Sequence, residues 1–342
     1  MQAERLLFPQ IRRVTWESFE LPAVLDSHTV MARAICSLVS AGTELAIYTG
    51  THIGFSLPEP PFPLMPYRPG YALVGEVTAL GREVSGLTVG QRVLMEAGHG
   101  TFASADTRTH AVIAVPDRIE DAQAPLARMA GISFTALRLG PPQLGESVVI
   151  TGLGLVGLLA GQLYRLAGAR PVIGVDRLPA RLALAKSFGI VPLDAAQHSL
   201  PGGITQILGC RGADIVVEAT GNPMLVPLAL EAAAPGGRVV LLGSTRGVVS
   251  LDVYSQIHRK AVRLIGAHET ALPFQSGREW SRVRNLQLAM QLIADGDLQA
   301  TGLITDHLGL DRALCAHEML HAEPETHLGI VIHWREKGSS PI

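Results

Sequence analysis

The segment VVITGLGLVG, residues 148–157, constrains the fold more than any other part of this 342-residue chain. A short apolar run is followed by glycines at positions 152, 154 and 157, and a second apolar run comes directly after them. Such a run is typical of a strand buried on both faces of a parallel sheet. The spacing G-x-G-x-x-G predicts that this strand turns sharply into a helix and begins a strand–helix–strand unit.

The three glycines have separate roles in a turn of this kind. Gly152 permits the tight bend, Gly154 lets a ligand approach the backbone, and Gly157 lets the helix pack closely on the strand. The helix N-terminus then presents N–H groups and a positive dipole to phosphate oxygens. The segment therefore predicts a site for the pyrophosphate of a dinucleotide. Its candidate binding residues are Gly152, Leu153, Gly154, Leu155, Val156 and Gly157.

Asp176 ends the next apolar run and indicates which dinucleotide binds. An acidic residue in this place accepts hydrogen bonds from the adenosine ribose hydroxyls and repels a 2′-phosphate, which favours NAD over NADP. Arg177 and Arg181 follow closely, and an arginine here can bind that phosphate, so NADP stays possible. Both arginines could equally be solvated residues on a helix surface.

Two later glycine turns are expected to flank the nicotinamide half of the site. ATGN, residues 219–222, and LLGST, residues 241–245, each follow an apolar run. Ligands of open α/β sheets bind outside the carboxyl ends of the strands, where such turns lie. The candidate residues in these turns are Thr220, Gly221, Leu242, Gly243 and Ser244.

The pattern of elements divides the chain into three segments. Residues 1–129 are rich in short β-type runs separated by Gly and Pro. Residues 130–268 alternate strands with helices, which predicts an α/β fold with a doubly wound parallel sheet. Residues 269–342 contain two helical patterns and a closing strand, so the α/β domain is expected to be inserted in a β-rich domain. The clearest β-type runs outside the insert are 28–40, 71–80, 91–97, 110–116 and 328–334; the clearest helices are 155–168, 179–189, 223–237 and 278–296.

Composition and charge exclude several classes of protein. The formal net charge is −2 and no run of Lys or Arg appears, so nucleic acid is not expected as a partner. The N-terminus lacks the apolar segment of a signal peptide, and no apolar run is long enough to cross a membrane. Cys36, Cys210 and Cys315 are too few and too far apart for a disulfide framework. These features predict a cytoplasmic protein with reduced thiols.

Several segments, in the right order, resemble the medium-chain dehydrogenase/reductase superfamily, which includes the zinc alcohol dehydrogenases. SAGTELAIYTG, PGYALVGEV and LTVGQRV are similar to that family's GICGTDLHIYRG, PGHEFVGEV and FKVGDRV segments. The resemblance implies a Rossmann domain inserted in a GroES-like catalytic domain. It also implies a homodimer formed through the edge strand near Val262–His268. The form S-x-G-T-E is similar to the branch that contains bacteriochlorophyllide dehydrogenases.

The chain departs from the family pattern at the zinc ligands. Ala41 stands where zinc-containing members have the catalytic cysteine. Tyr71 and Ala72 stand where they have the ligand histidine and the glutamate after it, and the four cysteines of the structural zinc lobe are absent. Because alanine supplies no ligand atom, we expect no metal at either family site.

Without zinc, a hydrogen-bond donor must polarise or protonate the substrate oxygen. The resemblance offers Thr43, which matches the proton-relaying Ser/Thr of the family, and Tyr71, whose phenol could reach the substrate. Thr43 could instead stabilise a local turn, and Tyr71 could be an aromatic wall of the pocket. Ser40 is a third candidate on the same loop, and Glu44 could fix this loop from behind.

Two histidines, His52 and His99, are weaker acid–base candidates. Both fall in loops expected to border the cleft, where a lone histidine is more often a surface residue.

Together these features predict a zinc-independent NAD(P)-dependent oxidoreductase that transfers hydride between the nicotinamide and an alcohol, a carbonyl compound or an activated alkene. Aromatic and proline residues in the loops 51–63 and 268–280 suggest an apolar, fairly bulky small-molecule substrate. The alternative is a catalytically silent dinucleotide-binding protein that acts as a sensor or scaffold.

A third interpretation comes from AHEMLHAEPETH, residues 316–327. His317, Glu318 and His321 form H-E-x-x-H, and His327 falls at the third ligand position of a metzincin zinc protease. However, a proline replaces the glycine at which a metzincin chain turns, and no methionine follows for a Met-turn. We therefore interpret the motif as a coincidence on an ordinary helix, with Glu318 in solvent.

Overall fold

The computed structural model describes residues 2–56, 62–209, 212–275 and 279–335. The chain divides into two compact units. The first unit comprises Met1–Arg128, Leu286–Gly296 and Ala300–Ile342, and the second comprises Met129–Asn285 and Asp297–Gln299. Residues 269–275 and 279–285, which the sequence pattern assigns to the third segment, cluster with the second unit.

The second unit is built on a six-stranded parallel sheet with the strand order β10-β9-β8-β11-β12-β13. The central strands β8 and β11 are almost entirely buried, as their continuous apolar runs predict. The doubly wound α/β sheet expected from the sequence is thus confirmed. The strands are β8 (Val148–Thr151), β9 (Val172–Asp176), β10 (Val191–Asp194), β11 (Ala213–Glu218), β12 (Ala233–Leu241) and β13 (Arg263–Gly266).

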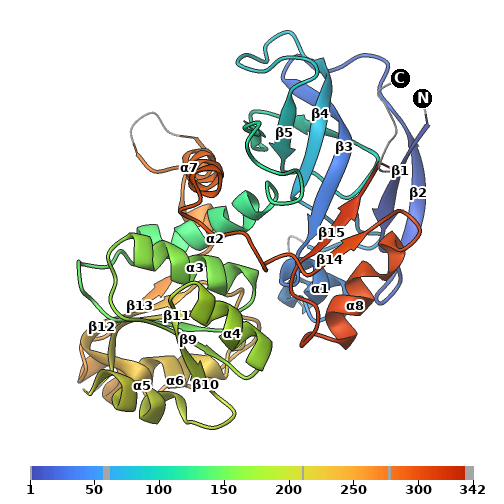
Figure 1. The fold of residues 1–342 in the computed structure, drawn as a ribbon. Coiled ribbons are helices and arrows are strands. Elements are labelled where there is room, and N and C mark those ends of the chain that lie inside the picture. The colour runs from blue at the N-terminus through green and yellow to red at the C-terminus, as the bar shows by residue number, and fades with distance from the viewer. Residues whose placement is uncertain (1, 57–61, 210–211, 276–278, 336–342) are drawn as a thin grey trace. The chain divides into compact units, whose positions relative to one another are not determined.

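Helices cover both faces of this sheet. Figure 1 shows α3 and α4 against one face, and α5 and α6 against the other. Buried apolar side chains of α5, α6 and the strands, among them Ile204, Leu230 and Val216, form the core of the unit on the second face. The helices are α2 (Leu126–Leu139), which begins in the first unit, α3 (Leu155–Leu166), α4 (Pro179–Ser187), α5 (Leu200–Leu208), α6 (Leu225–Ala232), and the short η2 (Val253–His258) and η3 (Glu269–Ala271).

One expected helix is shorter than the sequence pattern predicts. The apolar run at 223–237 predicts a helix throughout, but α6 ends at Ala232 and β12 begins at Ala233. Pro235 disfavours the helical conformation before it, and Gly236 has φ +76°, which no helix contains.

The first unit contains a seven-stranded sheet and a separate pair, β1-β2. Within the sheet, β14-β15-β3-β4-β5-β7 are successive neighbours and β6 pairs with β3. The expected strands are present, but β1, β2 and β6 were not predicted, because sequences such as TWESFE have too few buried positions to stand out. The strands are β1 (Gln2–Leu7), β2 (Thr15–Glu20), β3 (Thr29–Val39), β4 (Leu73–Leu80), β5 (Arg92–Met95), β6 (Phe102–Asp106), β7 (Val112–Ala114), β14 (Asp306–Leu308) and β15 (Ile330–His333).

Two helices from opposite ends of the chain lie side by side in the first unit. Helix α1 (Thr43–Tyr48) packs against α8 (Ala316–Ala322), as Figure 1 shows. This packing places the loop before α1 close to the H-E-x-x-H motif. The remaining helices are η1 (Ile53–Ser56), η4 (Ala313–Cys315) and α7 (Arg282–Asp295), which begins in the second unit.

Two sequence expectations concern the membrane and the thiols. None of the helices in the described ranges has the length and apolarity needed to cross a lipid bilayer. Cys36 is a buried free thiol, and Cys315 is free but exposed. Cys210 lies outside the described residues.

Candidate active site

The glycine turn between β8 and α3 shows what each glycine does. Gly152 has φ +86°, and a Cβ atom there would lie 2.5 Å from Cγ2 of Thr220. A Cβ on Gly157 would lie 1.9 Å from the carbonyl oxygen of Gly152, so a side chain would force the helix away from the strand. Gly154 differs, because a Cβ there would meet no atom within 4 Å. Gly154 therefore borders open space, as expected where a ligand approaches the backbone.

The N-terminus of α3 offers backbone donors to a phosphate. Gly154 is the N-cap residue, and no side chain of the described residues caps this end of the helix. The side chains of Leu153 and Leu155 are buried and that of Val156 partly so, which leaves the backbone of the turn as its polar surface. Uncapped N–H groups and the helix dipole attract anions, so this turn fits the pyrophosphate of a dinucleotide.

Asp176 is tied to the glycine turn by its carboxylate. Its Oδ2 accepts the N–H of Leu153 at 2.8 Å, and its Oδ1 accepts the N–H groups of Arg177 and Leu178 at 2.7 and 3.1 Å. Arg181 Nη1 lies 3.8 Å from the same Oδ2, whereas the side chain of Arg177 is exposed. A carboxylate has about four acceptor positions, so Asp176 can still accept a ribose hydroxyl.

The two later glycine turns lie against each other. A Cβ on Gly221 would lie 2.6 Å from the carbonyl oxygen of Ser244, and one on Gly243 would lie 2.3 Å from the nitrogen of Gly221. The structure therefore brings ATGN and LLGST together at the carboxyl ends of β11 and β12, where the sequence pattern placed them.

A buried glutamate that the sequence analysis missed holds these turns. The carboxylate of Glu218 accepts the N–H of Thr220 at 2.7 Å, that of Gly221 at 3.0 Å, and the Thr220 hydroxyl. Its carbonyl oxygen accepts the N–H groups of Leu242 and Gly243 at 2.9 and 2.7 Å. Burial raises the pKa of Glu218, although these donors oppose the shift. The one acid at the end of the apolar run ADIVVE was the available signal.

In the first unit, Ser40, Thr43 and Tyr71 lie around the start of α1. The Tyr71 hydroxyl donates to Ser40 Oγ at 2.5 Å, and the N–H of Gly42 donates to the same oxygen at 3.4 Å. Ser40 Oγ thus accepts two hydrogen bonds and keeps its own proton for another partner. The guanidinium of Arg128 lies 5.0 Å from the centre of the Tyr71 ring. Thr43 is the first residue of α1 and is partly exposed.

The catalytic zinc of the zinc alcohol dehydrogenases does not fit the corresponding residues. Ala41 and Ala72 end in methyl groups, which have no lone pair to donate to a metal. The Tyr71 hydroxyl, the one oxygen that a side chain supplies at these three positions, is already bonded to Ser40.

Behind this loop lies a fully buried cluster of Glu44, His99 and His317. Nε2 of His99 is 2.8 Å and Nε2 of His317 is 3.0 Å from Glu44 Oε2. The other carboxylate oxygen, Oε1, accepts the N–H of Ser40 at 3.0 Å. The two imidazole nitrogens and the carboxylate oxygen lie within 4.8 Å of one another, a donor set that could also hold a metal ion.

The protonation of this cluster follows from its burial and its contacts. Burial raises the pKa of Glu44, but attraction to the His99 imidazole and hydrogen bonds from His317 and His99 outweigh it and lower the pKa to about 2. Burial lowers the pKa of His317, although the Glu44 carboxylate opposes this shift. At neutral pH the cluster therefore contains an ionised carboxylate and a neutral His317.

His99, a weaker acid–base candidate from the sequence, lies in a loop but not at the surface. It is 1% exposed and bonded to Glu44. His52 is partly buried, and its Nδ1 accepts the N–H of Gly54 at 3.1 Å. Glu44 does lie behind the loop, as expected, and bonds the Ser40 backbone.

The three polar residues of the H-E-x-x-H motif and His327 bind four different partners. His317 is bonded to Glu44, whereas Nε2 of His321 lies 3.1 Å from Arg12 Nη2. Nδ1 of His327 lies 2.8 Å from Oδ2 of Asp306. Glu318 is exposed, as expected, and accepts the Tyr48 hydroxyl at 2.8 Å. The motif residues therefore do not converge on one site, but the interpretation that all of them are incidental missed the buried role of His317.

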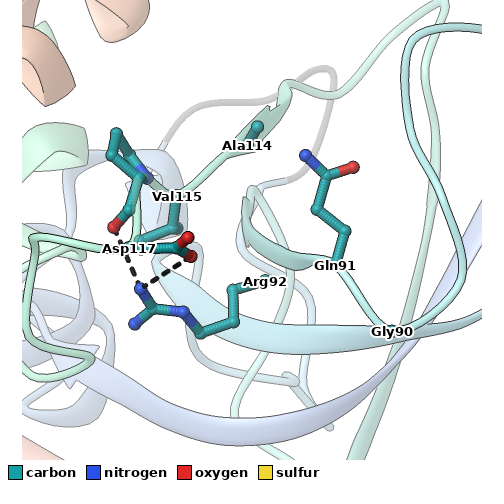
Figure 2. A pocket seen from close by; sticks show the side chains of 7 residues that line it. Gly90, Gln91, Arg92, Ala114, Val115 and Asp117 are labelled. Atoms are coloured by element: carbon teal, nitrogen blue, oxygen red, sulfur yellow. Dashed lines mark hydrogen bonds and ion pairs between the residues drawn. The ribbon is translucent and has the colours of Figure 1, made fainter.

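A hollow elsewhere in the first unit is a poor candidate for a substrate site. It has a volume of about 530 Å³ and lies between Gly90–Arg92 and Ala114–Asp117 (Figure 2). The Arg92 guanidinium, its main charged group, already binds the carbonyl oxygens of Pro116 and Ile119 and the carboxylate of Asp121.

Comparison with known families and proteins agrees with these features. Residues 30–123 match the alcohol dehydrogenase GroES-like domain, and residues 156–285 match the zinc-binding dehydrogenase family. L-threonine 3-dehydrogenase of Legionella pneumophila (strain Corby) is 32% identical over 235 residues, which are 60% of this chain and 68% of that protein. Sorbitol dehydrogenase of Bacillus subtilis (strain 168) is 26% identical over 341 residues, 90% of each chain.

Solved structures share the fold at lower identity. An Escherichia coli oxidoreductase/dehydrogenase of unknown specificity matches with a TM-score of 0.83 and 20% identity, over 97% of this chain and 99% of that chain. A short chain alcohol dehydrogenase of E. coli CFT073, complexed with NADH, matches with a TM-score of 0.82 and 17% identity, over 97% of this chain and 99% of that chain.

Proposed function

The chain belongs to the medium-chain dehydrogenase/reductase superfamily of NAD(P)-dependent oxidoreductases, and from this membership we propose that it acts without zinc on an alcohol or carbonyl substrate. The observation that carries the proposal is the Tyr71–Ser40 pair, which occupies the position of a family zinc ligand. Activated alkenes are a second substrate class open to the same chemistry. The small-molecule substrate is expected to be apolar.

The bound nicotinamide supplies or accepts the hydride. In the reduction of a carbonyl, the substrate oxygen becomes an alkoxide and needs a proton. Tyr71 is the more exposed member of the pair and gives its phenolic proton to that oxygen. Ser40, whose own proton is free to turn towards Tyr71, then donates to the phenolate left behind. Arg128 places a positive charge over the same ring.

Thr43 is the second donor in this proposal. It stands one turn from Ser40 at the partly exposed start of α1 and corresponds to the Ser/Thr that relays protons in zinc-containing relatives. Its hydroxyl binds the substrate oxygen together with Tyr71.

We propose NAD as the preferred dinucleotide, held by the α3 turn and Asp176. The Asp176 carboxylate ends β9 beside the glycine turn, and its charge opposes a 2′-phosphate. Arg181 lies near that carboxylate, which reduces the positive charge available to NADP. We further propose that the enzyme is a cytoplasmic homodimer, with no nucleic-acid or membrane partner.

The test is turnover of NADH and NAD⁺ against a panel of apolar aldehydes, ketones, enones and alcohols, using enzyme purified without chelators. We expect Tyr71→Phe to lower kcat by about 100-fold, the scale of one lost general acid, with an unchanged Kd for NADH. Tyr67→Phe is the matched control, since Tyr67 is a neighbouring phenol whose ring packs on Phe8, whereas the phenol bonded to Ser40 is that of Tyr71. It should leave kcat unchanged.

Three results would contradict the proposal. Full activity in the double variant Tyr71→Phe, Thr43→Ala would exclude both hydroxyls as donors. One equivalent of zinc whose removal abolishes turnover would exclude the zinc-independent mechanism. Tight NADH binding without turnover of any compound in the panel would favour a silent dinucleotide-binding protein.

A further inference from the structure

The buried cluster of Glu44, His99 and His317 is joined to the proposed proton donor through Ser40, which bonds Tyr71 with its side chain and Glu44 with its backbone. The Tyr71 hydroxyl donates to Ser40 Oγ, and the backbone N–H of Ser40 donates to Glu44 Oε1. The second carboxylate oxygen is bonded to both imidazoles. Glu44 thus connects the loop that bears Ser40 to α8, which lies 273 residues further along the chain at His317.

The contacts on the His99 side allow its proton to lie on the nitrogen that faces Glu44. The Trp334 indole N–H can only donate, and it donates to Ser37 Oγ at 2.8 Å. Ser37 Oγ lies 2.7 Å from Nδ1 of His99 and can give that nitrogen its own proton. His99 then has its proton on Nε2, where it faces the carboxylate of Glu44.

A hydrogen-bonded cluster fits His317 better than a metal does. A metal bound at Nε2 would leave the remaining proton on Nδ1, and metal-bound histidines almost always donate that proton to an acceptor. Nδ1 of His317 is buried and has no partner among the described residues. With the proton on Nε2, His317 instead donates to Glu44, and Nδ1 is left with only a lone pair. The carboxylate then receives three donors, from Ser40, His99 and His317.

We propose that Glu44, His99 and His317 are positioning residues that hold the Ser40 backbone, and through it the Tyr71 hydroxyl, in the geometry for proton transfer. This inference rests on the proposed function. Among the described residues, the backbone N–H of Ser40 is held by the Glu44 carboxylate, so losing that contact frees the residue that fixes the phenol. One histidine of the H-E-x-x-H motif therefore has a role in the site, and the other does not.

The first experiment compares three variants on α8 in the full-length enzyme, with NADH and the best carbonyl compound of the panel. His317→Ala removes the donor to Glu44, and we expect kcat to fall by about 100-fold, as misplacement of a reacting group by about 1 Å can cause, while KM for NADH stays unchanged. His317→Gln places an amide N–H where Nε2 stood and should restore most of the lost kcat. His321→Ala, on the same helix but bonded to Arg12, is the matched control and should match wild type.

Equal effects of His317→Ala and His321→Ala, or no rescue by glutamine, would overturn the positioning role. The outcomes separate the two proposals. If Tyr71→Phe is fully active, the proposed function fails. If Tyr71→Phe is impaired but His317→Ala is not, the positioning inference alone fails.

A second measurement needs no substrate and remains valid if His317→Ala does not fold. In wild-type protein labelled with ¹⁵N-histidine, we expect His317 to give the NMR signals of a neutral imidazole protonated at Nε2, and His99 to carry a proton on Nε2. The signals are assigned by their loss in His317→Gln and His99→Gln. A proton on Nδ1 with none on Nε2, for either residue, would contradict the network. So would one equivalent of zinc that is present in wild type and lost in Glu44→Gln.

Discussion

Two buried glutamates show how neighbouring donors decide the behaviour of one residue type. Glu44 and Glu218 are both fully buried, yet the pKa of Glu44 is lowered to about 2 and that of Glu218 is raised. Burial disfavours the charged form of both. Glu44 faces two imidazoles that donate to its charged form, whereas Glu218 faces only a hydroxyl and backbone N–H groups. Imidazole donors therefore keep Glu44 ionised in a site from which water is excluded.

The lowered pKa of His317 predicts how stability depends on pH. The folded state keeps His317 neutral while the unfolded chain takes up a proton below its ordinary pKa of about 6.5. Stability is therefore lost as pH falls through and below 6.5, and the Glu44 contribution is lost separately, between about pH 4.5 and 2. Between pH 7.5 and 5.5, wild type should lose more unfolding free energy than His317→Gln, because only wild type carries an imidazole whose pKa is lower in the folded state.

Urea unfolding at the two pH values measures this difference. The titratable groups that face His317 are Glu44, His99 and Tyr48, and all three are retained in the glutamine variant. Equal pH dependence in wild type and His317→Gln would show that folded His317 takes up a proton as readily as the unfolded chain does.

At the scale of elements, the six-residue turn between β8 and α3 contains glycines with different roles, one in folding and one in ligand binding. Gly157 is required by packing, because its Cβ position overlaps the backbone of Gly152. Packing does not require a glycine at position 154, because no protein atom lies within 4 Å of a Cβ built there. The same motif therefore contains one glycine that serves the fold and one that serves the ligand.

This difference predicts opposite outcomes for two alanine variants. Gly157→Ala should destabilise the protein by about 1–3 kcal/mol or more, because the backbone must move to admit the methyl group. Gly154→Ala should keep the wild-type melting temperature but bind NADH about tenfold more weakly, which corresponds to about 1.4 kcal/mol. Thermal unfolding and fluorescence titration with NADH measure the two effects. A stable Gly157→Ala, or unchanged NADH affinity in Gly154→Ala, would contradict these assignments.

At the scale of the whole molecule, the six-stranded sheet ends in the edge strands β10 and β13. An open edge presents unpaired backbone groups that another chain can bind. β13 is the edge at which the sequence pattern predicts a homodimer, and Leu264 on this strand is 38% exposed. Near it in the chain, Val253 and Tyr254 of η2 are also exposed apolar residues. Exposed apolar side chains next to an open edge support pairing of two copies through β13.

A charge at this edge should therefore convert a dimer to a monomer. We expect sedimentation equilibrium to give the mass of a dimer for wild type and of a monomer for Leu264→Asp. Val191→Asp is the matched control, because Val191 is 37% exposed on the opposite edge strand, β10. A dimer that survives Leu264→Asp, or one that Val191→Asp disrupts, would place the interface elsewhere.

Much of the fold and of the cofactor site could be predicted from local sequence. The glycine turn, Asp176 and the two later turns lie at the carboxyl ends of strands that apolar runs already marked. Parallel strands must bring these ends to one edge of the sheet, so the turns meet without further information. Glu218 was missed because a single acid at the end of an apolar strand resembles an ordinary solvent-exposed end.

The sequence by itself determined the turn at Gly152–Gly157, because Gly152 adopts a positive φ and a Cβ on Gly157 would collide with the carbonyl oxygen of Gly152. Only the tertiary structure decided the roles of Glu44, His99 and His317. His99 lies 55 residues and His317 273 residues from Glu44 in the chain. His317 reaches Glu44 because α1 packs against α8, and His99 reaches it from the loop between β5 and β6. No local sequence pattern predicts contacts between residues this far apart. The H-E-x-x-H motif, which suggested a metal site on one helix, instead supplies one imidazole, His317, to the buried carboxylate of Glu44.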